Sequence, residues 1–421
     1  MTDLPPAPAA DASPDLARRR AFRVLFLIVL ADMIGFGIII PVLPIYARDF
    51  GASNWQVTML LSVHALCQFV ASPLLGSLSD RIGRRPVLVF SQFGSGLAAF
   101  VLAYATWKLG GHAIGLWVIY AARMLDGFSG GNMSAAQAYV SDTVGPKEKA
   151  KFMGLLGAAF GIGFTLGPAV GGVLGHFNAA LAPLAAGLFS LTAAVLSYRF
   201  LPESLKAPVV HTESHLKRSI ALLREPVLTQ INVIWFLSMF AFVTTESIFA
   251  LFLTDDFAFP SWKVGFMFGL SGLVIIIVQG RLIGPLTRRL GEWNVATLGP
   301  LVFAVGAALF FVTTHEPILP LLIVATLANA TGRSLQTPAL STLISHQSPP
   351  GQQGAAFGLF QGFGALSRVA GPAVAGLLYD RKHAWPYVVA GSLALFTAFW
   401  TLTLRAQTTR RGDDVPAAAA D

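Results

Sequence analysis

The chain has 421 residues, of which 54% are hydrophobic and only 12% are charged, and its mean hydropathy is +0.65. A soluble globular protein carries about 25% charged residues, so most of this surface must face lipid, and a soluble enzyme is excluded. The net charge of +8 comes from short basic clusters between apolar stretches, which argues against nucleic acid as a partner. The single cysteine, Cys67, lies in an apolar run and is expected only to pack.

Residues 1–21 are predicted to be a disordered amino-terminal segment. They are rich in Pro, Ala and Asp, and the basic cluster Arg18, Arg19, Arg20 leads directly into a long apolar run. That run exceeds the roughly 7–15 residues of a signal-peptide core, so we expect a retained first membrane span.

Stretches of roughly 20 apolar residues, the length that crosses a bilayer as a helix, recur along the chain. A first bundle, residues 22–201, is predicted to have spans near 22–44, 56–79, 87–107, 113–141, 150–175 and 180–201. After a polar cytoplasmic linker, 202–226, a second bundle, 227–405, is predicted to have spans near 228–253, 262–287, 294–314, 318–343, 352–378 and 386–405. The chain ends in a predicted disordered tail, 406–421. We therefore predict an all-α membrane protein with twelve transmembrane helices in two six-helix bundles.

The basic residues indicate how these spans are oriented. If the amino terminus is inside, most Lys and Arg fall in inside segments, whereas the outside loops hold Arg48, Lys108, Lys263, Arg381 and Lys382. Because basic residues collect on the cytoplasmic side, both termini are predicted to be cytoplasmic.

The two halves of the sequence are related by an internal repeat. Gly167-Pro-Ala-Val-Gly-Gly-Val-Leu174 in span five matches Gly371-Pro-Ala-Val-Ala-Gly-Leu-Leu378 in span eleven. Gly76-Ser-Leu-Ser-Asp80-Arg-Ile-Gly83 matches Gly284-Pro-Leu-Thr-Arg288-Arg-Leu-Gly291 at nearly the same spacing. Two matches at nearly one offset predict a six-plus-six duplication, and transporters commonly carry such repeats.

The loop after span two reads Gly76-Ser-Leu-Ser-Asp80-Arg81-Ile-Gly83-Arg84-Arg85-Pro86. It is interpreted either as a basic loop that only orients the chain, or as an inside latch whose ion pairs hold the two halves together in one state. The segment resembles the signature loop of the major facilitator superfamily, and Asp142, at the inner end of span four, resembles that loop's acidic partner. Since a helix C-terminus disfavours an anion, Asp142 is expected to pair with a cation, Arg84.

Span five carries a stripe of small residues and a proline: Gly163, Gly167, Pro168, Gly171 and Gly172. The glycines permit close helix contact, and the proline bends the helix. This segment also resembles the motif of the family's proton-coupled drug antiporters.

The stretch Asp32-Met-Ile-Gly35-Phe-Gly37-Ile-Ile-Ile-Pro41-Val-Leu-Pro44, with Gln68 and Arg123-Met-Leu-Asp126-Gly127, is similar to the tetracycline-efflux branch of the same family. The resemblance implies the major facilitator fold and a proton-coupled antiporter that exports a lipophilic small molecule by alternating access. Ala98 in span three, where tetracycline pumps carry an acidic residue, departs from that branch.

Charged residues within the predicted spans indicate a mechanism. A charge at mid-bilayer costs about 2.5–3.5 kcal/mol, so such residues usually face a cavity and find partners. At about 1.5 Å per residue, Asp32 and Arg123 reach similar depths, so an ion pair between them is predicted, with Asp126 nearby. These groups are interpreted either as a proton carrier tuned by a neighbouring cation or as a static pair that fixes the packing.

Further polar residues within the spans are assigned to the same proton and substrate cavity: His64, Gln68, Glu246, Arg333 and Arg368. Glu246 would suit a cationic substrate, whereas the buried arginines would suit an anionic one. Each of them could instead be a packed or backbone-paired residue, and Arg281 is a further charge within a span.

The sequence has no metal-spaced Cys/His cluster and no nucleotide-binding loop of the form GxxxxGK[ST]. No metal and no cofactor are therefore expected, and the energy source is expected to be a proton gradient. The predicted partners are a small-molecule substrate, protons and the lipid bilayer, and the protein is expected to be a monomer in a bacterial inner membrane. Two alternatives remain: a carrier of sugars or organic anions, and a membrane receptor or scaffold that transports nothing.

Overall fold

The computed structural model describes residues 14–109, 112–143, 146–205, 221–349 and 352–411. The predicted disordered ends and the linker lie partly outside these residues, at 1–13, 206–220 and 412–421. Within the described chain, helix begins at Pro14 and ends at Arg411, inside the segments 1–21 and 406–421 that were expected to be disordered. The Leu, Ala and Arg residues that follow Pro14 are strong helix formers, which explains the longer first helix.

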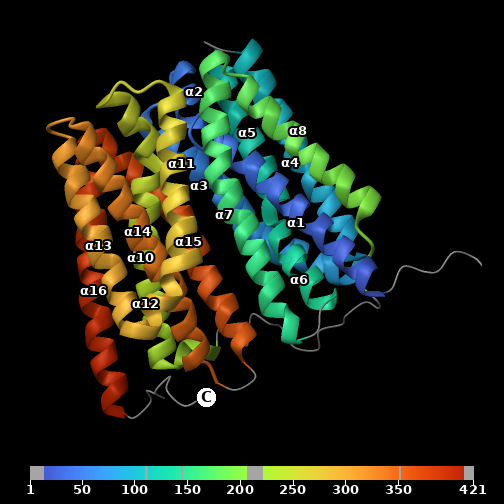
Figure 1. The fold of residues 1–421 in the computed structure, drawn as a ribbon. Helices are drawn as coiled ribbons and strands as arrows, with labels where there is room; N and C mark the ends of the chain where they lie inside the picture. The colour runs from blue at the N-terminus through green and yellow to red at the C-terminus, as the bar shows by residue number, and fades with distance from the viewer. Residues whose placement is uncertain (1–13, 110–111, 144–145, 206–220, 350–351, 412–421) are drawn as a thin grey trace, which may run out of the picture.

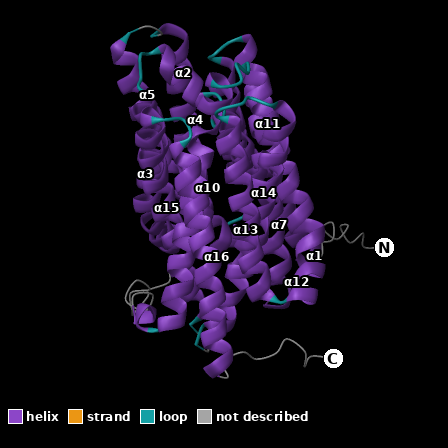
Figure 2. Ribbon diagram, turned by 90° about the vertical axis from the view of Figure 1, so that its left-hand side faces the viewer, coloured by secondary structure: helices purple, strands orange, loops and turns teal. Residues whose placement is uncertain are grey.

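The described chain is helical, without strands (Figure 2). The first half contains α1 (Pro14–Ile39), α2 (Leu43–Asp49), α3 (Asn54–Ile82), α4 (Arg84–Lys108), α5 (Ala113–Ser129), η1 (Gly130–Asn132), α6 (Met133–Thr143), α7 (Pro146–Phe177) and α8 (Leu181–Phe200). The second half contains η2 (Leu222–Arg224), α10 (Pro226–Asp255), α11 (Ser261–Ile277), the π-helical η3 (Val278–Leu282), α12 (Ile283–Leu290), α13 (Glu292–Thr313), α14 (Leu319–Gln347), α15 (Gln353–Arg381) and α16 (Trp385–Arg411).

Each predicted span coincides with a helix or with a helix interrupted once. Eight of the described helical stretches are long and apolar enough to cross a membrane, so the protein is a multi-pass membrane protein. The number of crossings, twelve, stays a prediction.

The fourth predicted span is broken at Gly130, where a short 3₁₀ turn separates α5 from α6. Two side chains bind the carbonyl groups there: Gln68 Nε2 donates to Gly130 O at 2.9 Å, and the Ser91 hydroxyl donates to Ser129 O. Carbonyl groups freed by a break inside a membrane need such partners, because lipid offers none. Gln68, assigned from the sequence to the cavity, therefore has a structural contact at this break.

The helices form two bundles that meet along two helix pairs. In the first bundle α1 packs on α7 and α8, and α4 packs on α5 and α8; in the second, α13 packs on α14 and α16, and α10 packs on α15 and α16. Between the bundles, α3 packs on α15 and α7 packs on α11. We call the end of the molecule that carries α2 the closed end and the end that carries α6 and α12 the open end (Figure 1).

The spacing between α7 and α11 changes along their length. Near the closed end, a β-carbon on Gly172 would lie 2.8 Å from the Cα of Gly265. Towards the open end, a β-carbon on Gly161 would lie 3.8 Å from Ile276 Cγ1, and one on Gly284 would meet no atom within 4 Å. Within the described residues, α7 and α11 are therefore in tighter contact near the closed end than towards the open end.

The hydrophobic cores show the same asymmetry. One core at the closed end includes Leu43 and Leu60 of the first bundle together with Phe252 and Tyr379 of the second. Towards the open end, each bundle has a core of its own. Among the described residues, burial of apolar surface thus joins the bundles at the closed end, whereas towards the open end each bundle buries its own apolar residues.

The repeat is visible in the backbone. Gly83, between α3 and α4, has φ of +109°, and Gly291, between α12 and α13, has φ of +78°. Only glycine adopts such angles at little cost, so both halves turn at the same place with the same residue type.

Candidate functional site

A cluster of charged and polar residues lies inside the first bundle on α3 and α5. Arg123 is buried, and its Nη1 donates to Asp126 Oδ2 at 2.6 Å. The same carboxylate oxygen lies 3.4 Å from Nδ1 of the buried His64, whose ring is 5.6 Å from that of Phe36. The Arg123 Nε and both His64 nitrogens have no hydrogen-bond partner within the described chain. One carboxylate thus balances a buried guanidinium beside a histidine with unused hydrogen-bonding capacity.

Asp32 lies half-buried on α1 of the same bundle. The ion pair predicted between Asp32 and Arg123 stays a prediction, while Asp126 is a partner that Arg123 does have. Asp126 follows Arg123 by three residues, a spacing that brings two side chains together on one helix face.

A second charged cluster lies in the second bundle on α10, α14 and α15. The charges of Arg333 and Arg368 act on Glu246, and the charge of Arg368 also acts on His64 of the first bundle. The Arg333 guanidinium lies over the Phe242 ring, 3.7 Å from its centre, as a cation–π contact. Arg368 is therefore near enough to both clusters for its charge to act on each.

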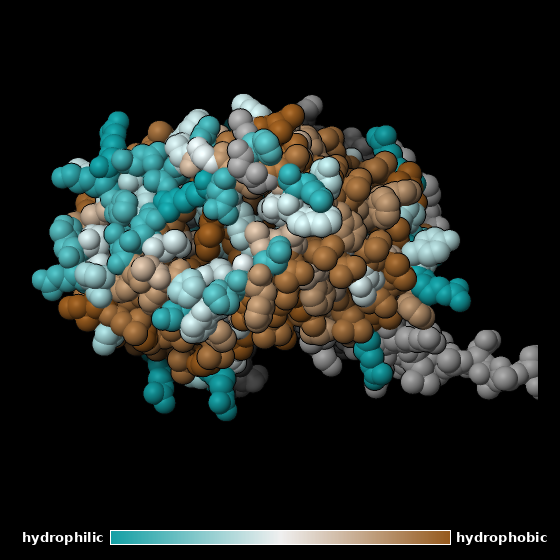
Figure 3. All heavy atoms as spheres, turned by 90° about the horizontal axis from the view of Figure 1, so that it is seen from above, coloured by the Kyte–Doolittle hydropathy of each residue, from teal (hydrophilic) through white to brown (hydrophobic). Residues whose placement is uncertain are grey.

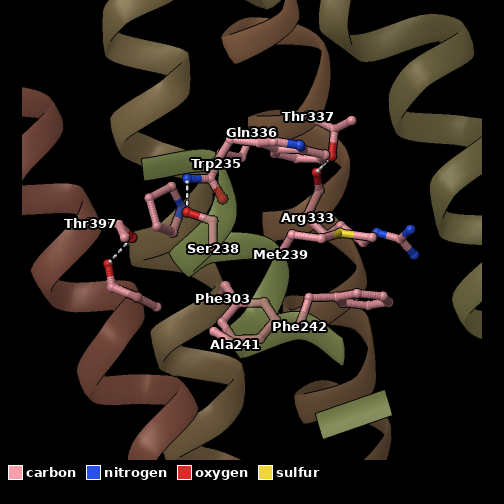
Figure 4. A pocket seen from close by; sticks show the side chains of 12 residues that line it. Trp235, Ser238, Met239, Ala241, Phe242, Phe303, Arg333, Gln336, Thr337 and Thr397 are labelled. Carbon is pink, nitrogen blue, oxygen red and sulfur yellow. Dashed lines mark hydrogen bonds between the residues drawn. The ribbon is translucent and has the colours of Figure 1, made fainter. Parts of the chain in front are cut away.

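A pocket in the second bundle adjoins this cluster (Figure 4). It is a narrow space between α10, α13, α14 and α16, with room for little more than a water molecule. Trp235, Phe303 and Met239 make it apolar, and Gln336 Nε2 donates to the Ser238 hydroxyl at 2.7 Å in its wall. The walls have the apolar character of small-molecule sites, but the space between them is too small for such a ligand.

Several residues of the predicted latch gather around Arg84 at the open end, and the contacts of Arg84 lie within the first bundle. Its Nε lies 3.0 Å from Asp142 Oδ2, its Nη1 contacts Asp80, and Nη1 also donates to the Ser79 hydroxyl at 2.7 Å. The predicted pair between Asp142 and Arg84 is therefore present. Arg84 is only 5% exposed, so this is a nearly buried guanidinium and not a freely solvated loop charge.

Glu203, which the sequence analysis did not single out, completes the latch. It follows α8, and its carboxylate accepts hydrogen bonds from the backbone N–H groups of Arg84 (2.9 Å) and Arg85 (3.1 Å) at the start of α4. It also accepts from the N–H groups of Ser204 and Leu205, both at 2.9 Å. A carboxylate at a helix N-terminus satisfies free N–H groups and the positive end of the helix dipole. In the sequence, the only feature that points to Glu203 is its position as an acidic residue just after a predicted span.

The remaining latch residues have more limited contacts. Arg85 packs its guanidinium over the Tyr198 ring at 5.3 Å and donates to the Tyr198 carbonyl. A β-carbon on Gly76 would lie 3.5 Å from Ser134 Oγ, an ordinary van der Waals distance. Arg81 lies on the last turn of α3 and is exposed.

The glycine stripe of span five lies on α7 and contacts two neighbouring helices. A β-carbon on Gly163, Gly167 or Gly171 would lie within 3 Å of α1 atoms, and Pro168 contacts Gly37. Gly172 contacts Gly265 of α11 in the other bundle. The predicted close helix contact is confirmed, and it includes one contact between the bundles.

Comparison with known proteins places this architecture in a family. Residues 25–316 and 282–420 match the model of the Major Facilitator Superfamily. The chain is 31% identical over 384 residues to Multidrug resistance protein 2 of Bacillus subtilis, covering 88% of this chain and 92% of that one. It is 29% identical over 368 residues to the class B tetracycline resistance protein of Escherichia coli, covering 86% and 88%. The crystal structure of the human organic anion transporter MFSD10 superposes with a TM-score of 0.67 at 26% identity, covering 91% and 99%.

Proposed function

The chain belongs to the Major Facilitator Superfamily, and we propose that it is a proton-coupled antiporter that exports a lipophilic small molecule by alternating access. The family and the fold make it a multi-pass membrane transporter and not an enzyme. The observation that carries the proposal is the pair of charged clusters, one in each bundle, around Arg123 and around Arg368, in a molecule open at one end.

The coupling follows from the chemistry of a buried carboxylate. In lipid surroundings an acid is costly as an anion unless a cation is near, so its proton affinity depends on its partners. Asp126 lies beside Arg123 and His64, and Asp32 lies in the same bundle. A substrate or a conformational change that alters these contacts would change whether a proton is held. Proton and substrate would then occupy the site in turn, which is antiport.

The closed end would face the outside and the open end the cytoplasm, with both termini cytoplasmic, as the distribution of basic residues supports. The protein would act as a monomer in a bacterial inner membrane, without a metal or cofactor. The bacterial relatives with drug-resistance names support that membrane, although MFSD10 of mouse and human also matches.

The substrate class is supported by the names of two relatives, a multidrug resistance protein and a tetracycline resistance protein. Ala98, which the sequence places where tetracycline pumps have an acid, favours a lipophilic compound other than tetracycline.

A carrier of organic anions is the second candidate. Among the described residues, the charges of Arg333 and Arg368 act on one carboxylate, that of Glu246, which would leave one positive charge in that cluster for an anionic group. The similar human structure is named as an organic anion transporter. A receptor or scaffold that transports nothing is disfavoured, because such a protein has no need to hold these charges within lipid.

A resistance and accumulation screen tests the proposal. Cells expressing the protein would be compared with cells carrying an empty vector, across cationic dyes, neutral antibiotics and aromatic organic anions, with and without a protonophore. We expect reduced accumulation of a lipophilic compound, abolished by the protonophore. Uptake of an organic anion, with no effect on dyes, would instead select the second candidate.

A further inference from the structure

The closed end carries a bidentate ion pair between the bundles. Arg48, in α2, binds Asp255 at the end of α10: Nη2 donates to Oδ2 at 2.8 Å, and Nη1 donates to Oδ1. The Arg48 Nε also donates to Asn54 Oδ1 at 3.2 Å, which fixes the guanidinium from the first bundle. A bidentate arginine–carboxylate pair is stronger and more directional than a single contact.

Asp255 is held in turn by other residues of its own bundle. Its Oδ2 accepts a hydrogen bond from the Tyr379 hydroxyl of α15 at 2.9 Å. The Tyr379 ring stacks on that of His383 at 4.2 Å, and His383 Nδ1 lies 3.0 Å from Asp256 Oδ1. The carboxylate that receives Arg48 is therefore positioned in advance.

A second contact joins the bundles through a helix terminus. The backbone N–H of Trp55, at the start of α3, donates to Asp380 Oδ2 of α15 at 3.1 Å. The first N–H groups of a helix lack partners within the helix, and its positive end favours a carboxylate. One turn before Asp380, a β-carbon on Gly376 would lie 2.8 Å from Trp55 Cα, so the helices are in direct contact here.

These contacts differ from those of the latch in what they connect. The residues bound by Arg84 all belong to the first bundle, whereas Arg48 and Trp55 each bind a carboxylate of the second. The side chains of Arg48 and Asp255 are 29% and 20% exposed, so water screens their pairing only in part. In Figure 3, which looks down on this end, hydrophilic residues lie among hydrophobic ones.

We propose that Arg48, Asp255 and Asp380 form a lock that holds the closed end shut, and that its strength sets the fraction of molecules open at that end. Opening must separate α2 and α3 from α10 and α15, which breaks both contacts. The inference rests on the alternation in the proposed function but on no particular substrate. Because hydrogen bonds to charged groups are individually strong, removing Arg48 should raise the ratio of open to closed molecules about tenfold or more.

The test measures a distance between the bundles at the closed end. In a Cys67→Ser background, spin labels at Asn178 and Glu316, exposed residues in the loops after α7 and after α13, report the separation in lipid nanodiscs. The matched control is Lys382→Ala, which removes an exposed positive charge at the same end. A second variant, Asp380→Ala, removes the contact with Trp55 and leaves the side chains of Arg48 and Asp255 in place.

We expect Arg48→Ala and Asp380→Ala each to add a longer distance that Lys382→Ala does not add. The double variant Arg48→Asp with Asp255→Arg should shorten the distances relative to Arg48→Asp alone. Distances in Arg48→Ala that match those of the control overturn the lock. Wild-type protein in the same nanodiscs, measured with and without ethidium at two pH values, separates the two proposals: if its distance changes there, alternation stands and only the lock fails.

Discussion

Glu203→Ala tests whether one exposed carboxylate organises the latch. The substitution removes the acceptor of four backbone N–H groups, those of Arg84, Arg85, Ser204 and Leu205. Loss of a helix cap costs about 1 kcal/mol, and loss of an anion at a helix N-terminus about 0.3–1 kcal/mol more. Since Glu203 is exposed, water replaces part of these bonds, and we expect a total loss of about 1–2 kcal/mol in the free energy of unfolding.

The assay is thermal unfolding of the purified protein in detergent. Glu225→Ala is the matched control, because Glu225 is also an exposed acid at a helix N-terminus, that of α10, but makes no capping hydrogen bond. The apparent melting temperature should fall clearly for Glu203→Ala, by less for Glu203→Gln, and hardly for Glu225→Ala. Equal melting temperatures for Glu203→Ala and Glu225→Ala would refute the reasoning.

Three further predictions concern transport. Asp80→Asn and Arg84→Ala should reduce turnover severalfold while leaving substrate affinity nearly unchanged, because the latch affects the equilibrium between the inward-open and outward-open states. Equilibrium binding and initial transport rates check this, and a large loss of affinity at full turnover would contradict it. Asp32→Asn should abolish proton-coupled export in protein that still inserts and folds, and normal substrate-driven proton flux in reconstituted vesicles would refute that. Glu246→Gln should impair export of cationic compounds and spare neutral ones in a resistance profile. Normal cation export in that variant, together with loss of organic-anion uptake in Arg333→Ala, would favour the anion carrier.

The positions of the helices could be predicted from the sequence because a bilayer imposes a length and a composition on each span. The latch pair Asp142–Arg84 could also be predicted, since an acid at the C-terminal end of a helix needs a cation nearby. The glycines of α7 predicted close contact for a similarly local reason, the absence of a side chain.

The contacts that depend on direction around a helix could not be predicted. Rise per residue gives the depth of Arg123 in the membrane but not the side of the helix on which it lies, and so the partner Asp126 on the same helix was not identified as such. Arg48 and Asp255 lie far apart in the sequence, and nothing local connects them. Before the structure, Arg48 counted only as a basic residue of an outer loop.

Substrate-driven proton movement in reconstituted vesicles tests whether the protein exchanges protons for a lipophilic substrate. Purified protein would be inserted into proteoliposomes whose lumen contains the pH-sensitive dye pyranine. A lipophilic cation such as ethidium, or the compound found by the accumulation screen, would then be added outside. If the protein is an antiporter, substrate entry drives protons out of the vesicles, so the lumen becomes more alkaline. Protein-free vesicles should show no such change. Substrate entry with no proton movement, or with protons moving in the same direction, would contradict antiport.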